Sequence, residues 1–238
     1  VAKSFIDKIK SENLEINLSI TSTSDTGKRT VGDLNYHNFF FKDESYDSSL
    51  VKKLKEADCI LISIPPKKGE DLVIKNFSKY IKDSSAKWIT YLSTTSVYGD
   101  HKGEWVNEQS ITKPTSQKGS SRLIAEKLWL SLEKKKLPIQ IFRLSGIYSN
   151  KNNTLIRLRD GQSRLVNKKN HFFSRIHVED IANVLFKSLS NFKSGEIYNI
   201  SDDKPASSAE VTSFGAKLLN LDNIKMIEVE NIENEILK

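Results

Sequence analysis

The chain has 238 residues with 37% hydrophobic and 28% charged side chains and a formal net charge of +7, values typical of one globular domain. No apolar stretch approaches the roughly 20 residues of a membrane-spanning helix, and the scattered lysines lack the interleaved aromatic side chains of a nucleic-acid-binding surface. The composition therefore predicts neither a membrane-spanning segment nor a nucleic-acid partner. The only cysteine, Cys59, cannot form an intrachain disulfide, which predicts a reducing, cytoplasmic setting, and its apolar neighbours predict a buried thiol.

Helical and extended patterns alternate along the first 145 residues. In chain order, apolar residues at helical spacing predict helices over 1–10, 49–57, 71–81 and 120–136. Strand patterns lie between them, over 15–21, 38–42, 59–64, 88–92 and 139–144. Two of these strands, 59–64 and 139–144, are apolar on both faces, as parallel strands covered by helices are. The alternation predicts an α/β fold with a doubly wound, Rossmann-type parallel sheet.

The pattern loosens after residue 145. Segment 150–170 is polar and basic, which predicts a loop with a short helix. The later predicted elements are helices over 178–190 and 208–219 and strands over 196–200 and 224–229. We expect a single domain over 1–238, in which 1–145 forms the nucleotide-binding core and 146–238 a mixed core with a small C-terminal substrate lobe.

Ligand-binding loops of such folds follow the carboxyl ends of the strands. One strand end carries Thr21, Ser22 and Thr23, followed by Lys28 and Arg29. NAD-binding folds usually place an acidic residue here for the ribose 2′-hydroxyl, whereas hydroxyls and a guanidinium suit a 2′-phosphate. These five residues are therefore predicted cofactor ligands that favour NADP over NAD. The alternative is a solvated polar turn.

Two further strand ends carry candidate site residues. Ile64, Pro65 and Pro66 follow a buried strand and are predicted to flank the cofactor backbone, although such a pair of prolines also simply ends strands. The next strand ends in a hydroxyl-rich segment with Ser93, a predicted cofactor contact, and Thr94, whose hydroxyl can hydrogen-bond a substrate carbonyl or alcohol. The alternative role of such hydroxyls is the capping of a turn.

A fourth segment, 114–126, completes an order of motifs that resembles the extended short-chain dehydrogenase/reductases, the group of nucleotide-sugar epimerases and dehydratases. Three later stretches agree: 142–148 resembles the family's arginine-containing strand and the loop after it, 176–182 its His-Val-Asp-Asp motif, and 195–200 its Tyr-Asn-Ile strand. The resemblance spans nearly the whole chain in the family's order. It implies an NAD(P) cofactor, hydride transfer and a small polar substrate such as a sugar nucleotide.

The chain departs from the family at the catalytic pair. Family members carry a tyrosine and, four positions later, a lysine that lowers the pKa of the tyrosine for proton exchange. Lys118 and Arg122 occupy these positions, while Thr94 matches the third partner, a serine or threonine. Arg122 could hold a ribose or a phosphate but cannot be deprotonated. Lys118 would carry a proton only with a strongly depressed pKa, and Tyr98 or water would otherwise supply it. The resemblance is therefore to an atypical subgroup that lacks the Tyr-x-x-x-Lys pair.

The Gly-x-Gly-x-x-Gly turn of the family is also missing. Residues 1–5 resemble the opening of the helix that follows this turn, so Ala2 would be its third small residue and a cofactor contact. We therefore expect the first strand and the Gly-rich turn to lie upstream of Val1.

Two functions remain open from the sequence, while a third, RNA binding on a Rossmann scaffold, is suggested only by the net charge of +7. One is an NAD(P)-dependent oxidoreductase or epimerase that acts on a sugar-nucleotide-like substrate through a non-standard site. The other is a non-catalytic NADP-binding sensor or regulatory module, which the missing catalytic pair favours. No metal site is expected, because the four histidines are dispersed. The helix over 120–136 is the candidate contact of a homodimer, and its one-sided apolar positions are Leu123, Ile124, Leu128 and Leu132.

Overall fold

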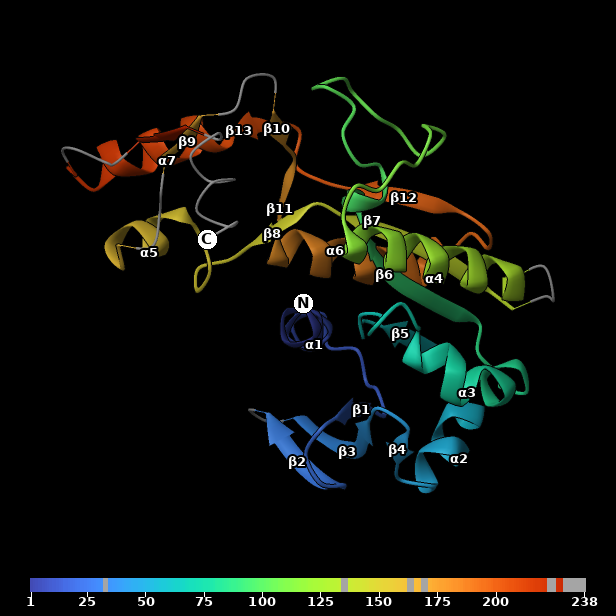
Figure 1. Ribbon diagram of the computed structural model, residues 1–238. Coiled ribbons are helices and arrows are strands. Elements are labelled where there is room, and N and C mark those ends of the chain that lie inside the picture. The colour runs from blue at the N-terminus through green and yellow to red at the C-terminus, as the bar shows by residue number, and fades with distance from the viewer. Residues whose placement is uncertain (32–33, 134–136, 162–164, 168–170, 222–225, 229–238) are drawn as a thin grey trace.

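The computed structural model describes residues 1–31, 34–133, 137–161, 165–167, 171–221 and 226–228. At its centre lies a parallel sheet with the strand order β12–β7–β6–β5 (Figure 1). The strands are β5 (Cys59–Ile62), β6 (Trp88–Thr94), β7 (Ile139–Leu144) and β12 (Ile197–Ile200). All four arise from segments with the predicted strand pattern, so the parallel α/β fold is confirmed.

Helices cover both faces of this sheet (Figure 1). One face carries α3 (Leu72–Lys82), against which α2 (Ser49–Glu56) packs, and α4 (Gln117–Glu133); the other carries α1 (Ala2–Ser11) and α6 (Val178–Ser190). Successive side chains of β6 alternate between the two cores: Ile89 and Tyr91 join the first, Trp88 and Leu92 the second. Pleating imposes this period of two. Both faces of β6 are therefore buried, which confirms the doubly wound arrangement.

A second, smaller sheet lies beside the first. In it β1 (Ser19–Ser22) runs parallel to β3 (Leu34–Lys42), while β2 (Gly27–Val31) and β4 (Ser45–Tyr46) pair with β3 in antiparallel fashion. Sequence analysis missed β2, because both faces of this strand are polar and its alternation carries no hydrophobic signal. The outer edge of β5 pairs with none of the described strands, and Cys59 at its start is exposed, so the expected buried thiol is wrong.

The C-terminal part forms a lobe above the carboxyl ends of the central strands (Figure 1). It is entered through β8 (Gly146–Tyr148), which pairs in parallel with β11 (Arg175–His177). The described residues of the lobe form two packed helices and two short strand pairs: α5 (Thr154–Arg159), α7 (Ser208–Leu218), β10 (Phe172–Phe173) with β13 (Ala206–Ser207), and β9 (Leu165–Asn167) with β14 (Met226–Glu228). Helix α5 is the short helix that the sequence predicts within 150–170.

Helix α4 begins at Gln117, three residues before the predicted start, and of the predicted apolar face only Leu132 is fully buried. Ile124 and Leu128 are 50% and 43% exposed, whereas Ala125, Glu126 and Trp129 face the sheet. The reason is tertiary: small residues allow the helix to lie close to the strands, and Glu126 meets a buried cation on β7. Within the described residues, no helix is long and apolar enough to cross a lipid bilayer.

Candidate functional site

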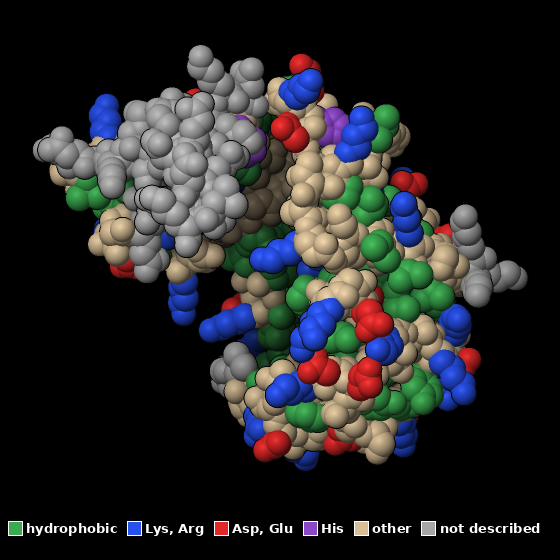
Figure 2. Space-filling view, in the orientation of Figure 1, with side chains coloured by type: hydrophobic (Ala, Val, Ile, Leu, Met, Phe, Trp, Pro, Cys, Tyr) green, Lys and Arg blue, Asp and Glu red, His purple; other side chains and the backbone are tan. Residues whose placement is uncertain are grey.

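Two clefts open at the carboxyl ends of the central strands. The larger, of about 1440 Å³, lies between the ends of β6 and β7, the loop that follows β6, and the C-terminal lobe; Figure 2 shows the molecule hollowed there. The smaller, of about 390 Å³, lies between the start of α1 and the ends of β5, β6 and β7. Three residues line both clefts, namely Thr94, Ser145 and Ile147. A ligand in one cleft can therefore meet a ligand in the other at these residues.

The smaller cleft is lined by hydroxyl groups, a helix start and an arginine. Ser63, Ser93 and Ser145 follow or end the three strands, and Ala2 belongs to the first turn of α1. The unpaired N–H groups and the dipole of a helix start favour anions. Of the predicted site residues, this cleft brings together Ala2, Ser93, Thr94 and Arg122.

Arg122 holds the end of β6 from the wall of the smaller cleft. Its Nη1 donates to the carbonyl oxygen of Leu92 at 2.6 Å and to the hydroxyl of Tyr91 at 3.1 Å, and its guanidinium lies 5.6 Å from the centre of the Tyr91 ring. Burial raises the pKa of Tyr91 to about 12, so this phenol stays protonated. Arg122 thus supplies a positively charged guanidinium group to the wall of the smaller cleft.

Thr94 stands at the junction of the clefts with a hydroxyl that is only partly engaged. Its Oγ1 accepts from the backbone N–H of Ser96 at 3.2 Å and so caps the short helix η1 (Thr95–Val97). Among the described residues the hydroxyl proton finds no acceptor, which leaves it available for a ligand oxygen. The predicted capping role and the predicted ligand role are therefore compatible.

Tyr98 lines the larger cleft, but its hydroxyl belongs to a buried polar network. It is 2% exposed; its hydroxyl donates to Asn199 Oδ1 at 2.7 Å and accepts from Arg143 Nη1 at 2.8 Å. Arg143 in turn pairs with Glu126, to which the Ser93 hydroxyl donates at 2.5 Å. The two hydrogen bonds of Tyr98 argue against it as the replacement proton donor. Because the Ser93 hydroxyl is bonded to Glu126, Ser93 would contact a ligand through atoms other than this hydroxyl.

The remaining predicted residues do not meet at the clefts. Lys118 is exposed in the first turn of α4, and Thr21, Ser22 and Thr23 occupy the exposed end of β1 and the turn after it. Lys28 and Arg29 lie on β2, where Arg29 Nη2 donates to the carbonyl oxygen of Asp25 at 3.3 Å. None of these six is among the residues that line the two clefts.

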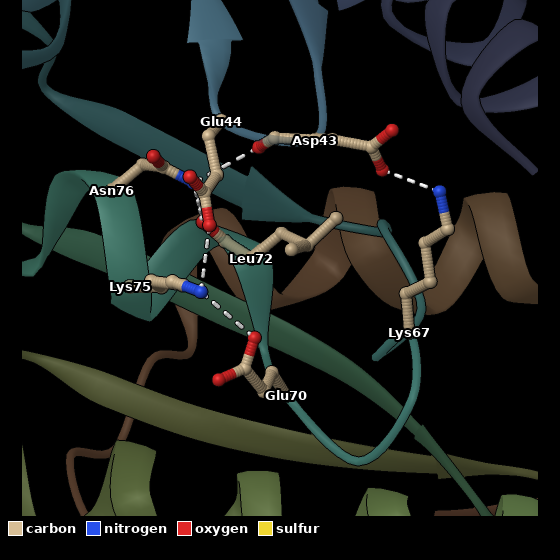
Figure 3. A network of polar contacts seen from close by, with 7 residues as sticks. All are labelled: Asp43, Glu44, Lys67, Glu70, Leu72, Lys75 and Asn76. Atoms are coloured by element: carbon tan, nitrogen blue, oxygen red, sulfur yellow. Dashed lines mark hydrogen bonds and ion pairs between the residues drawn. The ribbon is translucent and has the colours of Figure 1, made fainter.

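Ile64, Pro65 and Pro66 lie in a loop that surface ion pairs hold in place. Figure 3 shows Lys67 bonded to Asp43, and Lys75 of α3 bonded to Glu44 at 2.8 Å and to Glu70 at 2.9 Å. These two hydrogen-bonded carboxylates raise the pKa of Lys75. The loop after β5 is thereby tied to the β3–β4 turn, and it presents Ser63, not the prolines, to the smaller cleft.

The larger cleft combines two arginines with exposed aromatic rings. Arg157 and Arg175 line it, and burial together with the charge of Arg157 lowers the pKa of Arg175. Like charges this close favour a bound anion. The rings of Phe172, Phe173 and Phe214 are also exposed in this cleft. Sequence reasoning missed these residues, because they come from separate elements and share no motif. Within the described residues, no group of three or more His, Cys, Asp or Glu side chains could hold a metal.

Comparison with known proteins agrees with this fold. The profile of the NAD dependent epimerase/dehydratase family matches residues 74–201. A functionally unknown conserved protein from Silicibacter pomeroyi is 34% identical, with a TM-score of 0.74, and the match covers 82% of this chain and 67% of that one. No curated protein matches the sequence closely enough to count.

Two further solved structures resemble the chain in fold. The UDP-N-acetylglucosamine 4-epimerase from Bacillus cereus is 20% identical with a TM-score of 0.73, over 95% of this chain and 81% of that one. The dTDP-glucose 4,6-dehydratase from Streptomyces venezuelae, with NAD and TYD bound, is 16% identical with a TM-score of 0.78, over 94% and 80%. The family profile covers more than half of the chain. The chain belongs to the NAD-dependent epimerase/dehydratase family.

Proposed function

We propose that the smaller cleft holds a nicotinamide dinucleotide and the larger cleft a sugar-nucleotide-like substrate, on which the protein acts as an oxidoreductase or epimerase. The observation that carries the proposal is the junction of the two clefts at Thr94. The residues of the smaller cleft suit the cofactor: the start of α1 and Arg122 suit its phosphates and ribose, and hydroxyls suit its polar groups. When bound, a nicotinamide accepts or donates a hydride. Thr94 would orient the reacting substrate oxygen.

The chemistry of the larger cleft supports a sugar nucleotide as the substrate class. Arg157 and Arg175 would hold a diphosphate, because guanidinium groups bind phosphate through paired hydrogen bonds. Phe172, Phe173 and Phe214 offer ring faces on which a base can stack. The structurally similar enzymes from Bacillus cereus and Streptomyces venezuelae are named for UDP- and dTDP-linked sugars.

A non-catalytic NADP-binding sensor is the second candidate. It is favoured by the exposure of Lys118 outside both clefts and by the burial of Tyr98, which leave the site without its two expected proton carriers. The two functions share the cofactor and differ in turnover. An assay with NAD(P) and a panel of UDP- and dTDP-sugars separates them, because only the enzyme converts a sugar nucleotide.

NADP is the preferred cofactor in this proposal, on the basis of the hydroxyls at the end of β1 and of the exposed Lys28 and Arg29, which lie on β2 with β3 between them and β1. The proposal also includes a homodimer through the exposed apolar positions Ile124 and Leu128 of α4, and a cytoplasmic setting, on the basis of the single cysteine.

Calorimetric titration with NADPH and NADH tests the proposed cofactor. We expect binding of both and tighter binding of NADPH. Arg29→Ala should weaken NADPH by about 1–3 kcal/mol, the value of a charged hydrogen bond, and leave NADH nearly unchanged. Equal losses for the two cofactors would remove Arg29 from the phosphate site. If neither cofactor binds, the proposed function is wrong.

A further inference from the structure

Ser145 carries a buried hydroxyl without a partner at the junction of the two clefts. The residue is 4% exposed and directly follows β7, and its Oγ forms no hydrogen bond within the described part of the chain. Buried hydroxyls in folded proteins are almost always hydrogen-bonded, because desolvation without a partner costs free energy. An orphan hydroxyl on a residue that lines two clefts is therefore best explained by a ligand that completes it.

The backbone around Ser145 is held from both sides. The N–H of Ser145 donates to the carbonyl oxygen of Ile200 on β12 at 3.0 Å, and the N–H of Gly146 donates to that of Ser174 at 3.1 Å. The hydroxyl therefore sits on a fixed strand end. A side chain on a rigid element can hold a ligand group in one position.

We propose that the Ser145 hydroxyl hydrogen-bonds the carboxamide of the nicotinamide ring and so holds this ring against Thr94. This inference rests on the proposed function. Hydride transfer requires the reacting ring and the reacting substrate carbon to meet, and the clefts meet only at Thr94, Ser145 and Ile147 among their lining residues. Thr94 matches the family residue that faces the substrate oxygen, which leaves Ser145 for the ring. A carboxamide offers both a donor and an acceptor, and a serine hydroxyl can pair with either.

The test compares two ligands that differ by the nicotinamide alone. Calorimetric titration of the full chain uses NADH and ADP-ribose, which lacks the nicotinamide ring. We expect Ser145→Ala to weaken NADH about fivefold to tenfold, the value of one neutral hydrogen bond, with ADP-ribose affinity unchanged. Ser121→Ala is the matched control: this buried hydroxyl donates to the carbonyl oxygen of Gln117 and lines neither cleft, so both affinities should stay the same.

Thermal unfolding of the free variants distinguishes a ligand contact from a structural one. Ser145→Ala removes an unsatisfied hydroxyl, so its unfolding midpoint should equal or exceed that of the wild type. A lower midpoint with equal losses for NADH and ADP-ribose, or unchanged affinity for both, would overturn the assignment of Ser145 alone. If the wild type binds neither ligand, the proposed function fails and this assignment fails with it.

Discussion

Glu126 and Arg143 form an ion pair whose side chains are only 2% and 5% exposed. Arg143 Nη2 lies 2.8 Å from Glu126 Oε2, and the same two residues bind Ser93 and Tyr98. Burial by itself would lower the pKa of Arg143, but the hydrogen bonds and charge of Glu126 raise it above its usual value. Arg143 therefore keeps its charge beside Glu126.

Removal of one of these charges should be severe. We expect Glu126→Gln to lower the free energy of unfolding by roughly 3–5 kcal/mol, because Arg143 would remain charged, buried and unpaired. Urea denaturation measures the change. Lys75→Ala serves as the control, since its ion pairs are exposed and screened, and its effect should be much smaller. Similar losses in the two variants would contradict the role given to burial.

Thr94 allows a residue-scale test of catalysis. Thr94→Ala should reduce turnover by about 10²–10³-fold, the loss typical of a removed donor to a reacting oxygen, and leave NADH affinity nearly unchanged. Thr94→Ser keeps both the hydroxyl and the cap to Ser96, so it should retain most of the turnover. Steady-state kinetics and titration measure both effects. Full turnover in Thr94→Ala would refute the assigned role.

Among the elements, the loop that follows β6 shapes one wall of the larger cleft. It leaves Tyr98 through Gly99 and returns at Lys113, whose N–H donates to the carbonyl oxygen of Tyr98 at 3.0 Å. Gly99 has a φ of +75°, and a Cβ there would lie 1.7 Å from the carbonyl oxygen of Lys113. Only glycine fits this closure of the loop, for reasons of both conformation and contact.

Gly99→Ala should therefore lower the free energy of unfolding by more than the strain of a positive φ alone. Gly161 has a φ of +66° with open space around it, so Gly161→Ala isolates the conformational penalty of about 1 kcal/mol. We expect Gly99→Ala to cost roughly 3 kcal/mol or more, because the backbone must also move. Equal shifts of the two denaturation midpoints would show that the backbone at Lys113 moves away from the added Cβ without a loss of stability.

On the scale of the whole molecule, the larger cleft joins the sheet to a lobe with an arginine from each of α5 and β11. Arg157→Ala should weaken UDP about tenfold or more, because a charge-assisted phosphate contact is lost. Arg159 lies on the same helix but lines neither cleft, so Arg159→Ala should leave UDP binding unchanged. Calorimetry at two salt concentrations measures both. If the two variants weaken UDP binding equally, Arg157 acts only through the net charge of the surface and does not contact the phosphate.

The sequence by itself determined the class of the fold and the positions of its best-patterned elements. The apolar run over 139–144 is strand β7, and the helical spacing over 178–190 is helix α6, each with the predicted bounds. The spacing of apolar residues is a local property of the sequence, because it follows from which faces of a helix or strand are buried. The ordered motifs likewise sufficed for the family, and the strand-end rule sufficed to select Thr94.

Only the tertiary structure decided which side chains meet. Tyr98 has the right chemistry for a proton donor, but its hydroxyl is hydrogen-bonded to Arg143 and Asn199, which lie 45 and 101 positions away in the chain. Ser145 obeys the strand-end rule, yet its orphan hydroxyl becomes visible only when every neighbour is in place. Contacts between distant segments depend on packing and crossover geometry, which leave no periodic trace in the sequence.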